Sequence, residues 1–185
     1  MPFPAGYVEL LEALAEAFTY YRRRTGVSPL LVGGAAAAVM TAGAFMSGDF
    51  DIIAEDDAAF AEALEQAGFV IDRRRGKLAG GFYHPDFPEY GVEQVSGPPF
   101  DGRSDSHRLF VVRFHDDHSL TLPAFEDLIA DRLGQHAVAS ACDPSRLHQA
   151  QAILSIAKEV DVHYLTKRVI EEGGDLNLLD LSPFS

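Results

Sequence analysis

The spacing of apolar residues divides the chain into a mixed first part and a helical second part. Apolar side chains recur at helical spacing over residues 7–21 and 60–67, which predicts two amphipathic helices, each buried along one stripe. Residues 35–40 are small or apolar throughout and are expected to form a short helix. After Pro123 only helical spacing is found. The helices expected there cover residues 125–133, 147–157 and 162–169.

A second period, of two residues, marks the strands. It is clearest over residues 47–54, where Asp49 and Asp51 fall on one face of the expected strand and apolar residues on the other. Shorter strands, separated by turns rich in glycine and proline, are expected at residues 30–32, 69–72, 78–83, 90–95 and 108–114. These patterns predict an α+β fold, with a mixed sheet and flanking helices over residues 1–118 and a C-terminal helical bundle over residues 119–185.

Composition narrows the class of protein. The chain has 185 residues, 47% of them hydrophobic, which is enough to bury one core. Its lone cysteine, Cys142, can form no disulfide within the chain, and no signal peptide or long apolar run is present. A cytoplasmic protein with no membrane partner is therefore expected.

The charge of the chain argues against one class of function. The net charge is −13, whereas proteins that bind nucleic acids without sequence preference need basic surfaces to neutralise phosphates. The densest basic run, RRRGK at residues 73–77, is expected to be a solvated turn. If an anionic acceptor such as RNA binds outside the main site, this run is where it would be held.

Two sequence features carry the candidate chemistry. The expected strand at residues 30–32 ends in Gly33 and Gly34 and runs into a helix, so backbone amides at the helix N-terminus are open to a phosphate. Asp49 and Asp51 project from one strand face about 7 Å apart, a spacing that suits one or two hard cations. Together these features favour a site for a nucleoside triphosphate held with Mg²⁺ or Mn²⁺.

The segments VGG, residues 32–34, and SGDFDI, residues 47–52, resemble the signature of the DNA polymerase β-like nucleotidyltransferase superfamily. The resemblance implies that the glycine pair and Ser47 contact the triphosphate and that the two aspartates bind the metal ions. It also implies a third carboxylate on a later strand, for which Glu93 is the best candidate. Under this hypothesis the chain is an enzyme that transfers a nucleoside monophosphate to an acceptor hydroxyl.

Two later stretches extend the likeness. Residues 92–98 and 127–133 are similar to bacterial nucleotidyltransferase-like proteins of largely unknown function, which in turn are similar to the nucleotidyltransferase toxins of abortive-infection toxin–antitoxin pairs. That resemblance implies a basic residue near the phosphates, Arg132, and raises the hypothesis of a toxin with an antitoxin partner. The alternative for Arg132 is an ordinary ion pair at the helix surface.

The chain departs from these patterns at three places. Residues 44–46 contain no basic residue where relatives often carry arginine before the Ser or Thr. The third carboxylate is Glu93 rather than Asp, and Arg132 stands where the toxins usually have lysine. These departures leave open a catalytically silent protein that binds nucleotide or a partner. The sequence also leaves the acceptor open among RNA, a protein and a small molecule.

Overall fold

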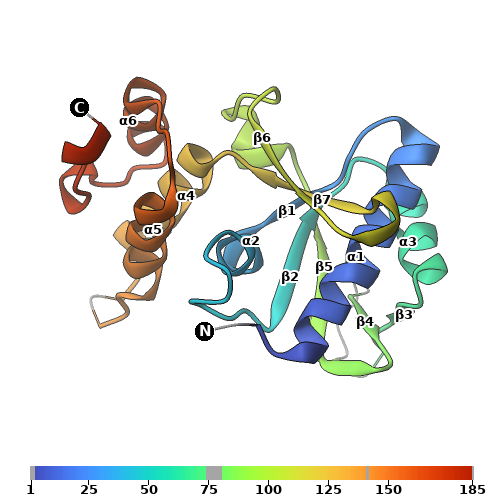
Figure 1. Ribbon diagram of the computed structural model, residues 1–185. Coiled ribbons are helices and arrows are strands. Elements are labelled where there is room, and N and C mark those ends of the chain that lie inside the picture. Colours follow the sequence, from blue (N-terminus) through green and yellow to red (C-terminus); the bar gives the residue numbers. More distant parts are fainter. Residues whose placement is uncertain (1–2, 74–80, 141, 185) are drawn as a thin grey trace.

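The computed structural model describes residues 3–73, 81–140 and 142–184 (Figure 1). The helices are α1 Ala5–Thr25, α2 Gly33–Met40, α3 Asp57–Gln66, α4 Phe125–Val138, α5 Ser145–Ile156 and α6 Val162–Glu171. The strands are β1 Leu30–Val32, β2 Asp49–Ile53, β3 Val70–Ile71, β4 Phe82–His84, β5 Phe87–Val95, β6 Leu109–Arg113 and β7 Ser119–Pro123.

A five-stranded mixed sheet, in the order β1-β2-β5-β4-β3, forms the centre of the first part. Strand β2 runs parallel to β5, whereas the pairs β1–β2, β4–β5 and β3–β4 are antiparallel. The α+β fold expected from the two periodicities is therefore confirmed. The strand expected at residues 78–83 lies partly outside the described residues, and β4 begins at Phe82.

The two faces of β2 have opposite environments because its side chains alternate. Phe50 and Ile52 are fully buried, and the Phe50 ring lies 5.2 Å from the ring of Tyr7 in α1, centroid to centroid. Asp49 and Asp51 occupy the opposite face, where Asp49 is exposed and Asp51 half-buried. One face of β2 thus holds the core together, and the other is left for a site.

Strands β6 and β7 form a separate two-stranded sheet. Strand β7 is buried along its whole length and packs beside α1 and β1. Its Leu120 and Leu122 point into the core at the spacing of a strand, although helical structure was expected after residue 118. The expected boundary between residues 118 and 119 falls at the start of β7, and the next helix, α4, begins at Phe125.

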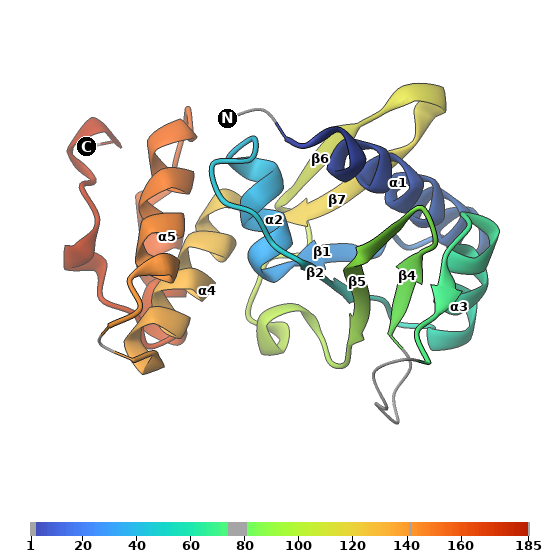
Figure 2. The same ribbon diagram turned by 90° about the horizontal axis from the view of Figure 1, so that it is seen from below.

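The C-terminal helices pack on one another beside the sheet, with α2 between them and the strands (Figures 1 and 2). The side chain of Arg168 in α6 is fully buried and donates hydrogen bonds to Asp127 in α4 at 2.6 Å, Glu171 at 2.6 Å and Glu172 at 2.7 Å. Burial raises the pKa of the Asp127 carboxyl, although hydrogen bonds from Arg168 and Tyr164 oppose this shift. A network of buried ion pairs therefore joins α6 to α4.

The end of α6 lies directly against α4. A Cβ atom on Gly134 would lie 2.6 Å from the carbonyl oxygen of Glu172, and one on Gly174 would lie 2.8 Å from the Cβ of Leu133. Only glycine allows so close an approach of the two backbones. The tail that follows packs on the chain's own core, where Leu179 is buried.

Candidate functional site

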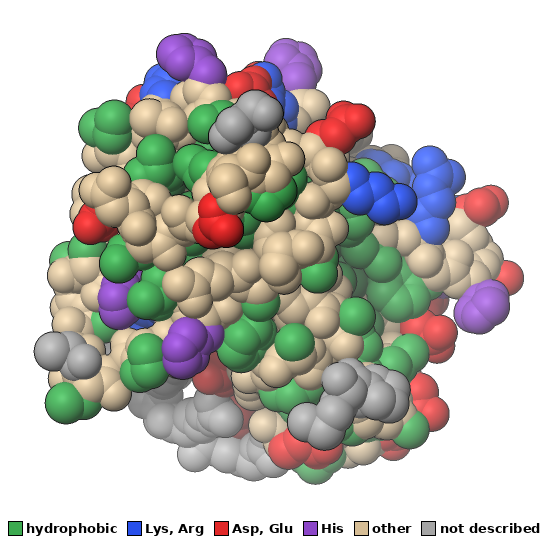
Figure 3. Space-filling view, turned by 60° about the vertical axis from the view of Figure 1, so that its left-hand side comes forward, with side chains coloured by type: hydrophobic (Ala, Val, Ile, Leu, Met, Phe, Trp, Pro, Cys, Tyr) green, Lys and Arg blue, Asp and Glu red, His purple; other side chains and the backbone are tan. Residues whose placement is uncertain are grey.

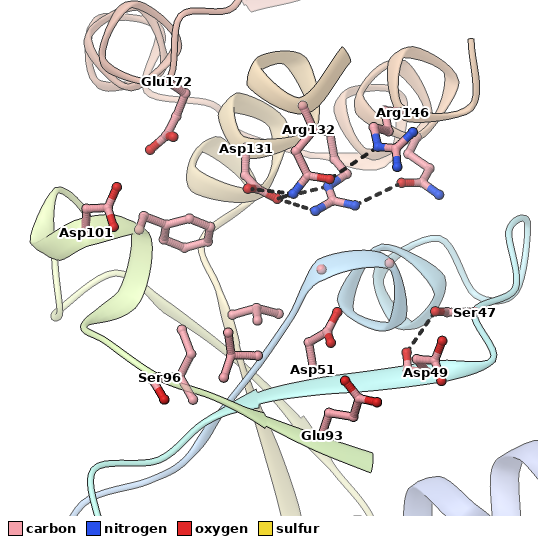
Figure 4. Close-up of a pocket in the computed structure, with 18 of the residues that line it drawn as sticks. Ser47, Asp49, Asp51, Glu93, Ser96, Asp101, Asp131, Arg132, Arg146 and Glu172 are labelled. Atoms are coloured by element: carbon pink, nitrogen blue, oxygen red, sulfur yellow. Dashed lines mark hydrogen bonds and ion pairs between the residues drawn. The ribbon is translucent and has the colours of Figure 1, made fainter. Parts of the chain in front are cut away.

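A cleft of about 710 Å³ lies between the sheet and the C-terminal helices (Figure 4). Its floor is formed by β2 and β5, and its roof by α4 and α5. Every site residue expected from the sequence lines this cleft: Gly33, Gly34, Ser47, Asp49, Asp51, Glu93 and Arg132. Residues that lie as far as 99 positions apart in the chain, Gly33 and Arg132, thus meet around one space.

Side chains of the cleft floor lie close to both residues of the glycine pair. Gly33 has a φ of 70°, and a Cβ atom there would lie 2.7 Å from Oδ2 of Asp51. A Cβ atom on Gly34 would lie 3.1 Å from Oγ of Ser47. The positive φ of Gly33 and the nearby carboxylate favour glycine there, whereas a Cβ atom on Gly34 would require only a small shift of the Ser47 hydroxyl. The amides at the start of α2 lie beside the carboxylate of Asp51.

The three carboxylates of the floor come from two neighbouring strands. Asp51 on β2 stands in register with Glu93 on β5, so their side chains leave the sheet on the same face. Asp49 lies two residues before Asp51, toward Ser47, whose hydroxyl donates a hydrogen bond of 2.8 Å to the carbonyl oxygen of Asp49. Figure 4 shows Asp51 and Glu93 close to one another, with Asp49 beside Ser47.

The electrostatics of the floor follow from this crowding. Burial raises the pKa of the Asp51 carboxyl, and the negative charges of Glu93 and Asp49 raise it further. The positive charge of Arg132, from across the cleft, acts in the opposite direction. A cation placed between these oxygens would relieve the repulsion, and carboxylate oxygens are the ligands that Mg²⁺ and Mn²⁺ prefer.

The side chains of Asp49, Asp51 and Glu93 are not arranged as a complete metal-binding site. Among the described residues, no group of three or more His, Cys, Asp or Glu side chains is arranged so as to hold a metal ion. The donor set nevertheless fits a hard cation, because all three side chains end in carboxylate oxygens. Asp51 and Glu93 are paired across neighbouring strands, and Asp49 lies two residues before Asp51 on the same strand face. Rotation about side-chain bonds is the change that binding would need.

The roof supplies positive charge. Arg132 of α4 is buried in the cleft wall, where its Nε donates a hydrogen bond of 3.0 Å to Asp131 and its Nη1 one of 3.5 Å to Gln149. It pairs with an acidic neighbour, as the alternative interpretation held, but inside the cleft rather than at the helix surface. Arg146 of α5 lies beside it (Figure 4). Arg146 also pairs with Asp143 at 2.8 Å.

Several cleft residues escaped the sequence analysis. Arg146, Gln149 and Gln135 come from the roof helices, and Phe100 and Glu172 from segments without any motif. The only sequence signal of the three roof residues is a polar position on a helix, which also describes ordinary solvent-facing residues, and Phe100 and Glu172 carry no such signal. Their place at the cleft depends on how the helical half docks on the sheet.

The remaining expectations concern charge and membranes. Of the basic run at residues 73–77 only Arg73 is described; it is exposed, and the rest lies outside the described residues. On the face drawn in Figure 3, lysine and arginine side chains gather mainly in one small group at the upper right.

Within the described ranges, no helix combines the length and the apolar character needed to cross a membrane.

Comparison with known proteins was made by sequence and by structure. No protein-family model and no curated protein sequence matches the chain. Solved structures do. An antigenic nucleotidyltransferase-like protein from Paracoccidioides brasiliensis superposes with a TM-score of 0.61 at 11% identity, covering 92% of this chain and 88% of that one.

Two structures of ANT(2″)-Ia are also similar. The solution structure of this antibiotic-resistance factor gives a TM-score of 0.54 at 10% identity, covering 88% of this chain and 90% of that one. Its crystal structure in complex with adenylyl-2″-tobramycin gives 0.57 at 8% identity, covering 92% and 98%. The chain therefore has a nucleotidyltransferase-type fold, as its motifs predicted.

Proposed function

We propose that this protein transfers a nucleoside monophosphate from a nucleoside triphosphate to an acceptor hydroxyl. One observation carries the proposal: the glycine pair, Ser47 and three carboxylates face a buried arginine across a single cleft. The absence of a side chain at Gly33 leaves room for the carboxylate of Asp51 at the start of α2, as a phosphate and cation site would need. The fold is shared with nucleotidyltransferases, but the proposed activity is argued from the residues of the site.

Each part of the cleft has a task in this proposal. The amides at the start of α2 and the hydroxyl of Ser47 bind the β- and γ-phosphates. Arg132 and Arg146 neutralise charge on the triphosphate from the roof. Glu93 accepts the proton of the acceptor hydroxyl, because it stands beside Asp51 at the expected position of the α-phosphate.

The proposal includes a divalent cation, Mg²⁺ or Mn²⁺, held by Asp49, Asp51 and Glu93. When bound, such an ion neutralises phosphate charge and favours deprotonation of the attacking hydroxyl. The raised pKa of Asp51 supports this assignment, since burial raises it first and the negative charges of Glu93 and Asp49 raise it further. The three residues supply oxygen ligands only, which disfavours softer metals.

The main alternative is a catalytically silent protein that binds a nucleotide in the same cleft. It is favoured by one observation, that Arg132 already bonds Asp131 and Gln149 while no basic residue occupies positions 44–46. Both proteins would bind a triphosphate. Only the enzyme would release pyrophosphate.

A pyrophosphate-release assay distinguishes the enzyme from the catalytically silent protein. The purified protein is incubated with Mg²⁺, each common nucleoside triphosphate, and an RNA oligonucleotide, a protein or tobramycin as acceptor. We expect release with one combination, and a loss of about a thousandfold in kcat for Asp51→Asn. The control is Glu159→Gln, because Glu159 is exposed and does not line the cleft. Nucleotide binding without any release would favour the silent protein, and equal rates for both variants would contradict the assignment of Asp51.

The toxin hypothesis stays a prediction. It requires that expression arrests growth and that Asp51→Ala relieves the arrest. An antitoxin partner would have to bind where it closes the cleft or blocks access to it.

A further inference from the structure

The roof of the cleft carries a set of five hydrogen-bonded polar side chains, which we call the roof network. It consists of Asp131, Arg132 and Gln135 of α4 and Arg146 and Gln149 of α5, all of which line the cleft. Only the two arginines of this network attract phosphate by charge. What engages these two side chains therefore decides how strongly the roof binds a triphosphate.

Asp131 is the centre of the roof network. Its carboxylate accepts hydrogen bonds from Nε of Arg132 at 3.0 Å and from Nη2 of the same guanidinium (Figure 4). Nε2 of Gln135, one helical turn further along α4, donates to the two Asp131 oxygens at 3.2 and 3.4 Å. Gln135 in turn accepts a hydrogen bond of 3.3 Å from Nε of Arg146. Both arginines are thus tied to one carboxylate, directly or through Gln135.

The pair of Asp131 and Arg132 is not one that a helix forms by its geometry alone. Neighbouring residues of a helix do not face each other, so the side chain of Arg132 turns back toward Asp131 to make the contact. Arg132 is 5% exposed and the side chain of Asp131 is 17% exposed. Water and salt therefore screen this pair much less than a pair at the surface.

Asp131 holds the edge of the guanidinium that suits a phosphate group. Arginine binds carboxylates and phosphates in the same way, through two parallel N–H groups. Nε and Nη2 of Arg132 form such an edge, and both donate to Asp131. The third nitrogen, Nη1, donates a longer hydrogen bond of 3.5 Å to Gln149. A phosphate that takes the Nε–Nη2 edge must therefore displace Asp131.

The same pair reduces the positive charge that the roof presents to the floor. Burial is the first cause of the raised pKa of the Asp51 carboxyl, and the charge of Asp131 is among the negative charges that raise it further. The charge of Arg132 lowers this pKa. The two members of the pair act on the floor in opposite directions, so a phosphate there meets less attraction than Arg132 alone would give.

We propose that Asp131 competes with the phosphates for Arg132 and thereby sets the affinity of the cleft for a nucleoside triphosphate. This inference rests on the proposed function, because it takes the cleft as the triphosphate site. On binding, Arg132 exchanges Asp131 for phosphate oxygens, while Gln135 continues to donate to Asp131. On release of pyrophosphate, Arg132 pairs with Asp131 again, which lowers the affinity for this product.

Titration calorimetry with inorganic tripolyphosphate tests the inference, because this ion carries the anionic part of every nucleoside triphosphate. With Mg²⁺ present, Asp131→Asn should bind tripolyphosphate and pyrophosphate about tenfold more tightly than the parent protein, since asparagine keeps the shape of the side chain without its charge. Asp101→Asn is the matched control. Asp101 also lines the cleft but pairs with Arg103, so the affinity should change less than about twofold.

A double-mutant cycle shows whether the gain passes through Arg132. In an Arg132→Gln background, adding Asp131→Asn should change the affinity less than about twofold. A full tenfold gain in that background would show that Asp131 only repels phosphate. Weaker or unchanged binding by Asp131→Asn itself would show that Asp131 orients Arg132 or has no part in binding. Each of these results would overturn the inference.

The same titrations separate this inference from the proposed function. Tighter binding by Asp131→Asn, with no pyrophosphate released from any nucleoside triphosphate, would support the competition and contradict the transfer reaction. Release by the parent protein, with equal affinities for parent and Asp131→Asn, would contradict the competition alone. Absence of tripolyphosphate binding by the parent and by every variant would overturn both.

Discussion

Two regions of the molecule each gather three carboxylates, and they balance this charge in different ways. At the junction of α4 and α6, Asp127, Glu171 and Glu172 surround the guanidinium of Arg168, which is fully buried. On the cleft floor, Asp49, Asp51 and Glu93 share one face of the sheet, and the cation that acts on Asp51 comes from across the cleft.

The difference distinguishes a structural cluster from a binding site. A buried charge that is paired and hydrogen-bonded fixes one packing of the helices, and losing the partner is costly. Repulsion left on an accessible floor lowers stability but provides binding energy for a cation. If this comparison is right, substitutions in the first cluster change stability and substitutions in the second change ligand binding.

The largest effect is expected for Arg168→Met. The change leaves the buried carboxylate of Asp127 without its cation, while Glu171 and Glu172 keep their pairs with Lys167 and Arg103, so the free energy of unfolding should fall by about 3–5 kcal/mol. Urea denaturation followed by circular dichroism measures it. Lys167→Met is the matched control, because Lys167 makes only an exposed pair with Glu171 at 3.7 Å and should cost less than about 0.5 kcal/mol. Equal losses for both variants would remove the distinction between the clusters.

Next in size is Gly33→Ala. The added methyl group would lie 2.7 Å from Oδ2 of Asp51 and displace that carboxylate, so nucleotide affinity should fall by about ten- to a hundredfold. Gly173→Ala is the control, because Gly173 has a nearly equal φ of 73° and no atom within 4 Å of an added Cβ. Both variants should lose similar stability through backbone strain. Only Gly33→Ala should lose nucleotide binding, measured by titration calorimetry.

A smaller effect is expected for Arg146→Gln. Arg146 is half-exposed on the roof and already pairs with Asp143, so its loss should raise the KM for the nucleotide about three- to fivefold. Arg113→Gln, an exposed change on β6 away from the cleft, should leave KM unaltered. A tenfold greater effect on kcat than on KM would assign Arg146 to the reacting atoms instead.

The smallest effect is a change of melting temperature with pH. The pKa of Asp51 is raised in the folded protein, so its contribution to stability is full below its ordinary pKa and is lost as the pH rises through the raised value. In EDTA, Asp51→Asn should therefore melt a few degrees above the parent protein at neutral pH. The gap should vanish at about pH 4. A variant less stable than the parent at neutral pH would show that Asp51 serves the fold.

The floor of the site was predictable because its residues follow local rules. Asp49 and Asp51 are fixed on one face by the strand period, and the glycine pair ends a short apolar strand. Glu93 was identified because the resemblance implied a third carboxylate on a later strand, and it proves to be in register with Asp51.

The roof and the buried network were not predictable from local rules. Arg146 and Glu172 reach the cleft only because α5 and the end of α6 dock where they do, and the end of α6 meets α4 at glycines whose contacts no periodicity encodes. Strand β7 was missed because a helical stretch follows it so closely that its five residues were assigned to that part. Arg168 lies in the last turn of α6, where basic residues are common, and only packing makes it the centre of a network.

The central claim is that the floor carboxylates bind a cation-bound triphosphate. It is tested most directly by titrating each nucleoside triphosphate, with Mg²⁺ and then with EDTA, into the parent protein, Asp51→Asn and Lys167→Met. We predict binding that requires Mg²⁺, disappears in Asp51→Asn and persists in Lys167→Met. Binding that is indifferent to Mg²⁺, or that Asp51→Asn retains in full, would contradict the account.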